Sequence, residues 1–187
     1  MIAKATIWFV PVAALLLGDA AATRFDRVVA ALQAGQAAEA IGGHRQAATL
    51  RAAAVTLVVT GATPAAGSED LAEHWQSVAA RSDPNGAPVA AYRNRALGPA
   101  YRTVNLPGGG KAVFDQVFLA GQRARVSVVP VNKSGFQLTV DDDDNRAVCA
   151  NAAVGNRCEW IPSWTTRFRV NLVNPGVGAG VYYLVVQ

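Results

Sequence analysis

Histidine is scarce in this chain of 187 residues, which contains only two, His44 and His74. Two histidines are too few for a multi-histidine metal site and leave little room for histidine-based catalysis. The chain also lacks the motifs of serine nucleophile elbows, zinc proteases, phosphate loops and dinucleotide sites. We therefore predict no catalytic and no cofactor-binding residue, and expect a protein that is not an enzyme.

Charge is equally sparse, at 16% of residues, and the 17 basic side chains are spread along the chain without a long basic run. This distribution argues against a nucleic-acid partner, which needs clustered positive charge. Hydrophobic residues make up 51% of the chain. That content with so little charge excludes disorder as the main state.

Long apolar runs are also missing. The N-terminal run, residues 5–18, contains Pro11 and is shorter than the ~20 residues that span a membrane. It follows Lys4 and precedes Ala20 and Ala22, the spacing of a signal peptidase site. We predict a signal peptide over residues 1–22, export to the periplasm or the outside, and no transmembrane anchor.

Residues 23–67 allow two interpretations. Basic residues precede the apolar run 52–61, and small residues follow it, which is again a signal-like order. Alternatively, the helical spacing of Phe25, Val28 and Leu32 indicates ordinary amphipathic helices. In the next segment, residues 68–97, we expect a short helix capped by Ser68 and then a linker.

The second half of the chain changes character, because 16 of the 25 valines but only 8 of the 37 alanines lie after residue 100. The hydrophobic period there is two, with turn signals every 8 to 12 residues. We predict a mainly β fold, with a jelly-roll-like antiparallel β-sandwich over residues 98–187 preceded by an α-helical, alanine-rich segment. The eight expected strands are 101–106, 112–119, 124–129, 136–141, 147–149, 158–161, 167–173 and 182–186.

The only two cysteines, Cys149 and Cys158, are separated by eight residues that read as a loop between two strands. An even count in an exported chain favours a disulfide. Two thiols are too few for a structural zinc site. We expect the Cα atoms of the pair to lie within roughly 7 Å.

Residues 114–184 resemble the bacterial pre-peptidase C-terminal domain, a small β-sandwich appended to secreted proteins. The matching segments are FLAGQ at 118–122, LTVD at 138–141 followed by an acidic turn, VC at 148–149, CEW at 158–160, TT at 165–166, the strand at 168–173, VNPG at 173–176 and YL at 183–184. The resemblance implies a jelly-roll-like sandwich with a non-catalytic role in adhesion, targeting or assistance to a partner.

The acidic turn DDDDN at 141–145 places Asp141, Asp143 and Asn145 in the alternating order that opens a calcium loop. The continuation departs from that loop, because residue 146 is arginine where glycine belongs. Weak calcium binding at these three residues is one hypothesis. A solvated acidic turn with Arg146 or Arg157 nearby is the interpretation that we prefer.

A possible ligand surface comprises Arg123, Arg125, Arg167 and Arg169, which fall on the outward sides of two predicted strands. Together they would make a basic stripe, although solubilising charge on a wet sheet face is the preferred interpretation. Trp164 is the aromatic side chain that we expect to be exposed. Trp160 and one tyrosine of 182–183 are expected to fill the core.

These features predict a secreted or periplasmic, non-catalytic β-sandwich module that binds an envelope protein or glycan. One alternative is a small hydrolase built on paired carboxylates such as Asp115 and Asp144. A glycan-binding, lectin-like module is another. A structural subunit with a free sheet edge at 182–186 is the remaining possibility.

Overall fold

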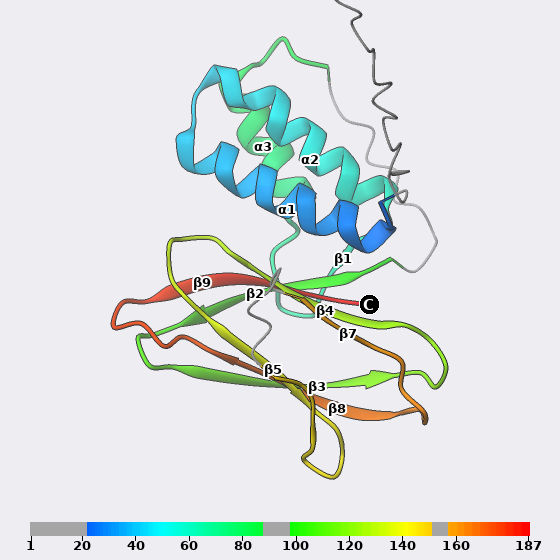
Figure 1. The fold of residues 1–187 in the computed structure, drawn as a ribbon. Helices are drawn as coiled ribbons and strands as arrows, with labels where there is room; N and C mark the ends of the chain where they lie inside the picture. Colours follow the sequence, from blue (N-terminus) through cyan, green and yellow to red (C-terminus); the bar gives the residue numbers. More distant parts are fainter. Residues whose placement is uncertain (1–21, 88–97, 151–156) are drawn as a thin grey trace, which may run out of the picture.

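The structure is a computed structural model that describes residues 22–87, 98–150 and 157–187. These residues form three layers: a group of helices and two stacked sheets (Figure 1). The helices cover the outer face of the first sheet, sheet A, and leave the outer face of the second, sheet B, open to solvent. Within the described ranges, no helix is long and apolar enough to cross a membrane.

The helical layer consists of α1 (Arg24–Ile41), a short turn η1 (His44–Gln46), α2 (Ala47–Val59) and α3 (Leu71–Ser82). α1 begins at a capping box, in which Thr23 and Asp26 each accept a hydrogen bond from the other's backbone N–H. It ends at Gly42, whose φ of 68° suits glycine. The apolar run 52–61 lies mainly in α2, and the helical segment expected before the sandwich is confirmed.

The start of α3 differs from the prediction. Ser68 belongs to a turn in which its N–H donates to the Ala65 carbonyl at 2.9 Å and Gly67 has a φ of 78°. The helix begins at Leu71, and the Asp70 carboxylate caps it by accepting a hydrogen bond from the Ala72 N–H at 3.1 Å. A serine and an aspartate two residues apart are both good caps, so the sequence did not decide between them.

All eight predicted strands are present. Sheet A has the order β1-β2-β9-β4-β7, and sheet B the order β3-β8-β5-β6. The pairing is antiparallel except between β1, which the sequence did not reveal, and β2. The mainly β sandwich is therefore confirmed. The strands are β1 (Thr63–Pro64), β2 (Ala100–Leu106), β3 (Lys111–Phe118), β4 (Ala124–Pro130), β5 (Gln137–Asp141), β6 (Ala147–Ala150), β7 (Arg157–Trp160), β8 (Thr166–Val173) and β9 (Gly180–Val186).

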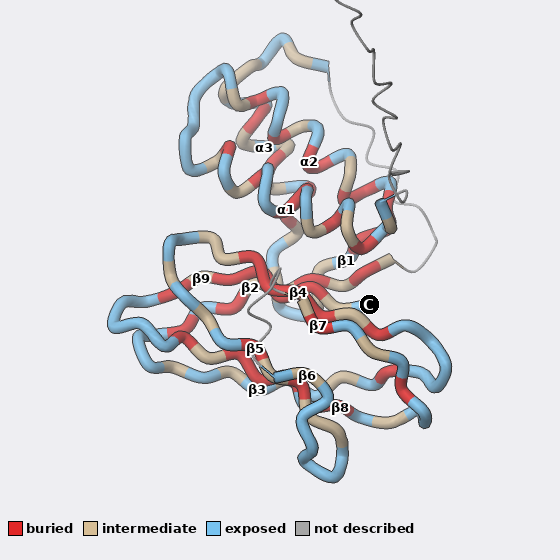
Figure 2. Tube along the Cα trace, viewed as in Figure 1, coloured by how far each residue is buried: buried red, intermediate tan, exposed pale blue. Residues whose placement is uncertain are grey.

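Two apolar cores hold the layers together (Figure 2). The first lies between the helices and sheet A, where Trp75 packs with residues that include Tyr101 and Tyr183. The second lies between the sheets and contains Tyr182, Val170 and other side chains. A central strand with both faces covered explains the unbroken apolar run of β9. The free edge considered for residues 182–186 is therefore wrong, because β9 lies between β2 and β4.

The helical layer is also attached to sheet A by a polar contact at the start of α1. The Arg157 guanidinium of β7 pairs with the Asp26 carboxylate and lies 5.3 Å from the centre of the Phe25 ring. The Arg125 guanidinium of β4 donates to the Thr23 hydroxyl at 3.1 Å. The capping box therefore fixes both the first turn of α1 and its position on the sheet.

Replacing Asp26 with asparagine is expected to lower the free energy of unfolding by about 1.5–3 kcal/mol at pH 7, the range for hydrogen bonds to a charged group. The Thr23 hydrogen bond, followed by the Arg157 guanidinium, lowers the pKa of Asp26. A lowered folded-state pKa means that the stabilisation is complete above the unfolded value of about 3.9 and is lost as the pH falls through the folded value.

Denaturant titrations between pH 7 and pH 2 measure this difference. The difference in free energy of unfolding between wild type and variant should become smaller below about pH 4. The matched control is Asp115→Asn, since Asp115 is half-exposed and its ion pair with Arg167, at 3.7 Å, is worth little. An Asp26→Asn effect that stays constant down to pH 2, or that Asp115→Asn equals, would contradict this account of the contact.

Candidate functional site

An open groove of about 610 Å³ lies between the β5–β6 hairpin and the β7–β8 connection. Its lining consists of residues 142–144, Arg146, Val148, residues 160–166 and Phe168. The hairpin supplies carboxylates, and the β7–β8 connection supplies apolar and aromatic side chains. A concave surface that combines apolar walls with a few polar groups is the usual form of a binding site.

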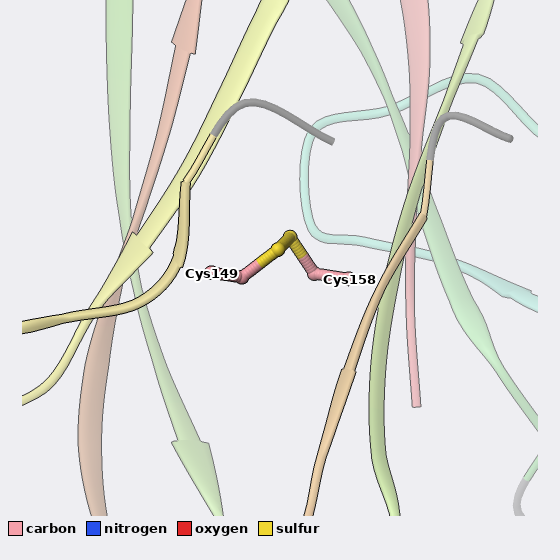
Figure 3. The surroundings of a disulfide bond; sticks show 2 residues. All are labelled: Cys149 and Cys158. Carbon is pink, nitrogen blue, oxygen red and sulfur yellow. A yellow bond between two sulfur atoms is a disulfide. The ribbon is translucent and has the colours of Figure 1, made fainter. Parts of the chain in front are cut away.

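A disulfide and a backbone hydrogen bond restrain the segments that border the groove. Cys149 of β6 and Cys158 of β7 form a disulfide with a Cα–Cα distance of 5.9 Å (Figure 3), which confirms the predicted pairing. β6 and β7 are edge strands of different sheets, so the bridge joins the two sheets beside the groove. The Gly121 N–H also donates to the Pro162 carbonyl at 2.8 Å, which ties the β3–β4 turn to the β7–β8 connection.

Aromatic side chains form the inner wall of the groove. Trp160 packs edge-on against Phe118, with ring centroids 4.9 Å apart, and lies 5.3 Å from Phe168. Tyr182 is fully buried between the sheets, so the expectation that Trp160 and one tyrosine face the core is met. Since Trp160 is anchored on two rings, this wall is a preorganised surface.

Trp164 has the opposite environment, as the sequence predicted. Its side chain is 79% exposed, and Ile161 in the same connection is 60% exposed. An exposed indole keeps a large apolar surface in contact with water, which is unfavourable in free energy unless a ligand covers it. Together with Val148, which is 38% exposed on the other wall, these residues give the groove an apolar, solvent-facing surface.

The acidic turn is a tight hairpin. Asp142 holds it by accepting the Arg146 N–H at 2.8 Å, and Asn145 has a φ of 59°, which asparagine tolerates. Asp144 forms a long 3.7 Å ion pair with Arg146. Arg146 is therefore the nearby arginine, whereas Arg157 is turned away to Asp26.

The three predicted calcium ligands each face a donor from β8. Asp141 accepts from the Asn171 amide at 2.8 Å, Asn145 accepts from Arg169 at 2.7 Å, and Asp143 accepts from the Thr166 hydroxyl. Among the described residues, no group of three histidine, cysteine or acidic side chains is arranged to hold a metal. Calcium at Asp141, Asp143 and Asn145 stays a prediction.

The four arginines of the predicted stripe are not brought together. Arg123 and Arg125 both pair with Glu159 on the outer face of sheet A, and the Arg125 guanidinium also lies 5.9 Å from the centre of the Phe25 ring of α1. Arg167 and Arg169 lie on the outer face of sheet B, since Phe168 and Val170 between them point into the core. Strand periodicity shows that a side chain points outward, but not from which of the two sheets.

The two carboxylates of the hydrolase hypothesis, Asp115 and Asp144, do not line the same groove. Asp144 borders the groove, whereas Asp115 lies on β3 outside its lining and pairs with Arg167. Both side chains are more than half exposed. An acid and a base that share a cleft would need different and partly buried environments.

The sequence interpretation missed a polar cluster in the helical layer. The two ring nitrogens of His74 lie 2.6 Å from a Glu39 oxygen and 2.9 Å from a Glu69 oxygen. The Trp75 indole N–H donates to the other Glu39 oxygen at 2.9 Å. His74 therefore links α3 to Glu39 of α1. The same two glutamates also affect Tyr183. Burial is the main cause that raises the pKa of Tyr183 to about 12, and the negative charges of Glu39 and Glu69 add to the effect.

Comparison with known proteins gives partial structural matches only. No protein-family model matches the chain, and no curated protein matches it in sequence. Among solved structures, the chain is similar to the pre-peptidase C-terminal domain of a collagenase from Bacillus anthracis, with 18% identity and a TM-score of 0.40 over 46% of this chain and 87% of that one. The family predicted from the sequence is therefore among the structures that this chain resembles, over about half of its length.

Two other solved structures match a similar share. The Yersinia pseudotuberculosis-derived mitogen is 13% identical, with a TM-score of 0.43 over 48% of this chain and 85% of that one. A periplasmic inhibitor of g-type lysozyme from Aeromonas hydrophila is 14% identical, with a TM-score of 0.41 over 48% of this chain and 84% of that one.

Proposed function

We propose that this chain is an exported, non-catalytic module that binds an envelope protein or glycan in the groove between the β5–β6 hairpin and the β7–β8 connection. The observation that carries the proposal is Trp164, a large apolar side chain left 79% exposed at a preformed groove. Exposed tryptophans in concave sites are frequent binding hot spots.

Two further observations support this proposal. The disulfide between Cys149 and Cys158 suits an oxidising compartment outside the cytoplasm, as does the signal-like order of residues 1–22. Asp115 and Asp144, the carboxylates considered for hydrolysis, are exposed, arginine-paired and without a common cleft, which favours binding over catalysis.

Truncation of Trp164 to alanine is expected to weaken binding to envelope material at least tenfold, because a hot-spot tryptophan contributes about 2 kcal/mol or more. Binding is measured by co-sedimentation of the purified full chain with two fractions from the cells that make it: peptidoglycan sacculi and membrane vesicles with their proteins. The bound fraction is followed against increasing amounts of each.

The matched control is Val177→Ala. Val177 is fully exposed in the β8–β9 turn, at the end of the sandwich away from the groove (left in Figure 1). Both variants should keep the wild-type melting temperature, since neither side chain is buried. Equal binding by wild type and Trp164→Ala, or an equal loss in Val177→Ala, would overturn the proposal.

A further inference from the structure

We infer that the groove binds a positively charged, extended segment of a partner protein, with an arginine or lysine side chain placed against Trp164. This inference rests on the proposed function and adds the chemical class of the ligand. It starts from the charges at the groove, which differ in sign from the chain as a whole. The chain has a formal net charge of +4, yet three of the four charged side chains that line the groove are acidic: Asp142, Asp143 and Asp144, against Arg146.

Arg146, the cationic side chain that lines the groove, is only weakly bound to its partner Asp144. Arg146 and Asp144 are 80% and 71% exposed, and their charged atoms are 3.7 Å apart. An exposed pair of this kind contributes very little to stability. A cation from a ligand therefore meets carboxylates that the protein itself neutralises only weakly.

Trp164 adds a second attraction for the same type of ligand. A cation placed over an indole face is attracted by the negative charge of the ring, and a planar guanidinium also stacks on it. The aliphatic stem of an arginine or lysine can then cover Ile161, which is itself 60% exposed. Carboxylates, an indole face and an exposed aliphatic side chain together match all parts of such a side chain.

The position of the groove favours a peptide over an isolated amine. The groove lies beside β6 and β7, which are the edge strands of sheet B and sheet A. In the described residues β6 pairs only with β5, and β7 only with β4. An extended segment can hydrogen-bond to such an edge while alternate side chains enter the groove. An uncharged glycan would use Trp164 but would bring no positive charge to the carboxylates.

The test is a calorimetric titration of the purified full chain in low-salt buffer with three probes. The first is an eight-residue peptide that alternates arginine with threonine or valine, the second has citrulline in place of every arginine, and the third is an oligomer of N-acetylglucosamine. Citrulline keeps the shape of arginine and removes its charge. We expect the arginine peptide to bind, the citrulline peptide to bind at least tenfold more weakly, and added salt to weaken the arginine peptide.

Three variants locate the binding site. Asp143→Asn/Asp144→Asn removes two groove charges and leaves Asp142, which holds the hairpin backbone. It should weaken the arginine peptide by about tenfold. Trp164→Ala should do the same. Asp115→Asn, which removes one charge outside the groove, should change affinity less than twofold, and melting temperatures should stay close to that of wild type.

Each remaining outcome overturns the inference. Equal affinity for the citrulline peptide, or an equal loss in Asp115→Asn, would mean that groove charge does not select the ligand. Binding of the glycan and not of the arginine peptide, with loss in Trp164→Ala, would refute the cationic ligand and leave the proposed function standing. Binding of no probe, with envelope binding that Trp164→Ala abolishes, would also reject a cationic segment. Absence of any Trp164-dependent binding would reject both proposals.

Discussion

Truncation of Trp75 to alanine is expected to lower the free energy of unfolding by about 3–5 kcal/mol, the range for emptying a buried tryptophan site. Trp75 of α3 is completely buried in the core between the helices and sheet A, and its indole N–H donates to Glu39. Its loss leaves a cavity and an unpaired carboxylate oxygen. Because Tyr101 and Tyr183 of sheet A belong to the same core, the variant should unfold in one transition at lower denaturant, measured by tryptophan fluorescence and circular dichroism.

Gly35 provides the control for this packing. A Cβ at position 35 would lie 2.4 Å from the Trp75 ring, so Gly35→Ala should destabilise the wild type by about 1–3 kcal/mol, despite the better helix propensity of alanine. In the Trp75→Ala background the ring is gone, and the same substitution should be neutral or stabilise by up to about 1 kcal/mol. An identical cost in both backgrounds would contradict close packing of the two residues.

Removal of the disulfide, by Cys149→Ser/Cys158→Ser, is expected to lower the free energy of unfolding by about 2–3 kcal/mol. The bridge spans a sequence separation of nine residues and restricts the unfolded chain accordingly. It also joins β6 and β7, which are edge strands of different sheets. Urea titrations of wild type, wild type with reductant and the double variant measure the effect.

Reduction of the wild type serves as the internal control. The reduced wild type and the double variant should unfold at nearly the same urea concentration, below that of the oxidised protein. Reductant should have no effect on the double variant. Identical midpoints for the oxidised and reduced wild type would contradict a stabilising bridge.

The strands were predictable because period-two patterning and turn residues are local signals. The segments around Phe168 and Leu138 alternate clearly, and each became a strand with one buried face. β9 was also found, but its role was not. A run with both faces covered shows no alternation, so its position at the centre of sheet A could not be read from the sequence alone.

The candidate site was only half predictable. The acidic turn and the exposed Trp164 were each recognised, yet nothing local indicates that the β5–β6 hairpin and the β7–β8 connection border one groove. That proximity depends on strand order. The same limit explains why Arg125 and Arg169 fell on opposite outer faces. It also explains why the pairing of His74 with Glu39, from a different helix, was missed.

The claim that this groove is the binding surface is tested most directly in intact cells. A photo-reactive amino acid, p-benzoylphenylalanine, replaces Ser163 in one version of the protein and Val177 in another, and the cells are irradiated. Ser163 is exposed and lines the groove beside Trp164, which stays unchanged. Our account predicts a discrete covalent adduct with an envelope component from position 163 that disappears when Asp143 and Asp144 are also changed to asparagine, and none from position 177. The account would be contradicted by folded, exported protein that forms no adduct at 163, or by the same adducts from both positions.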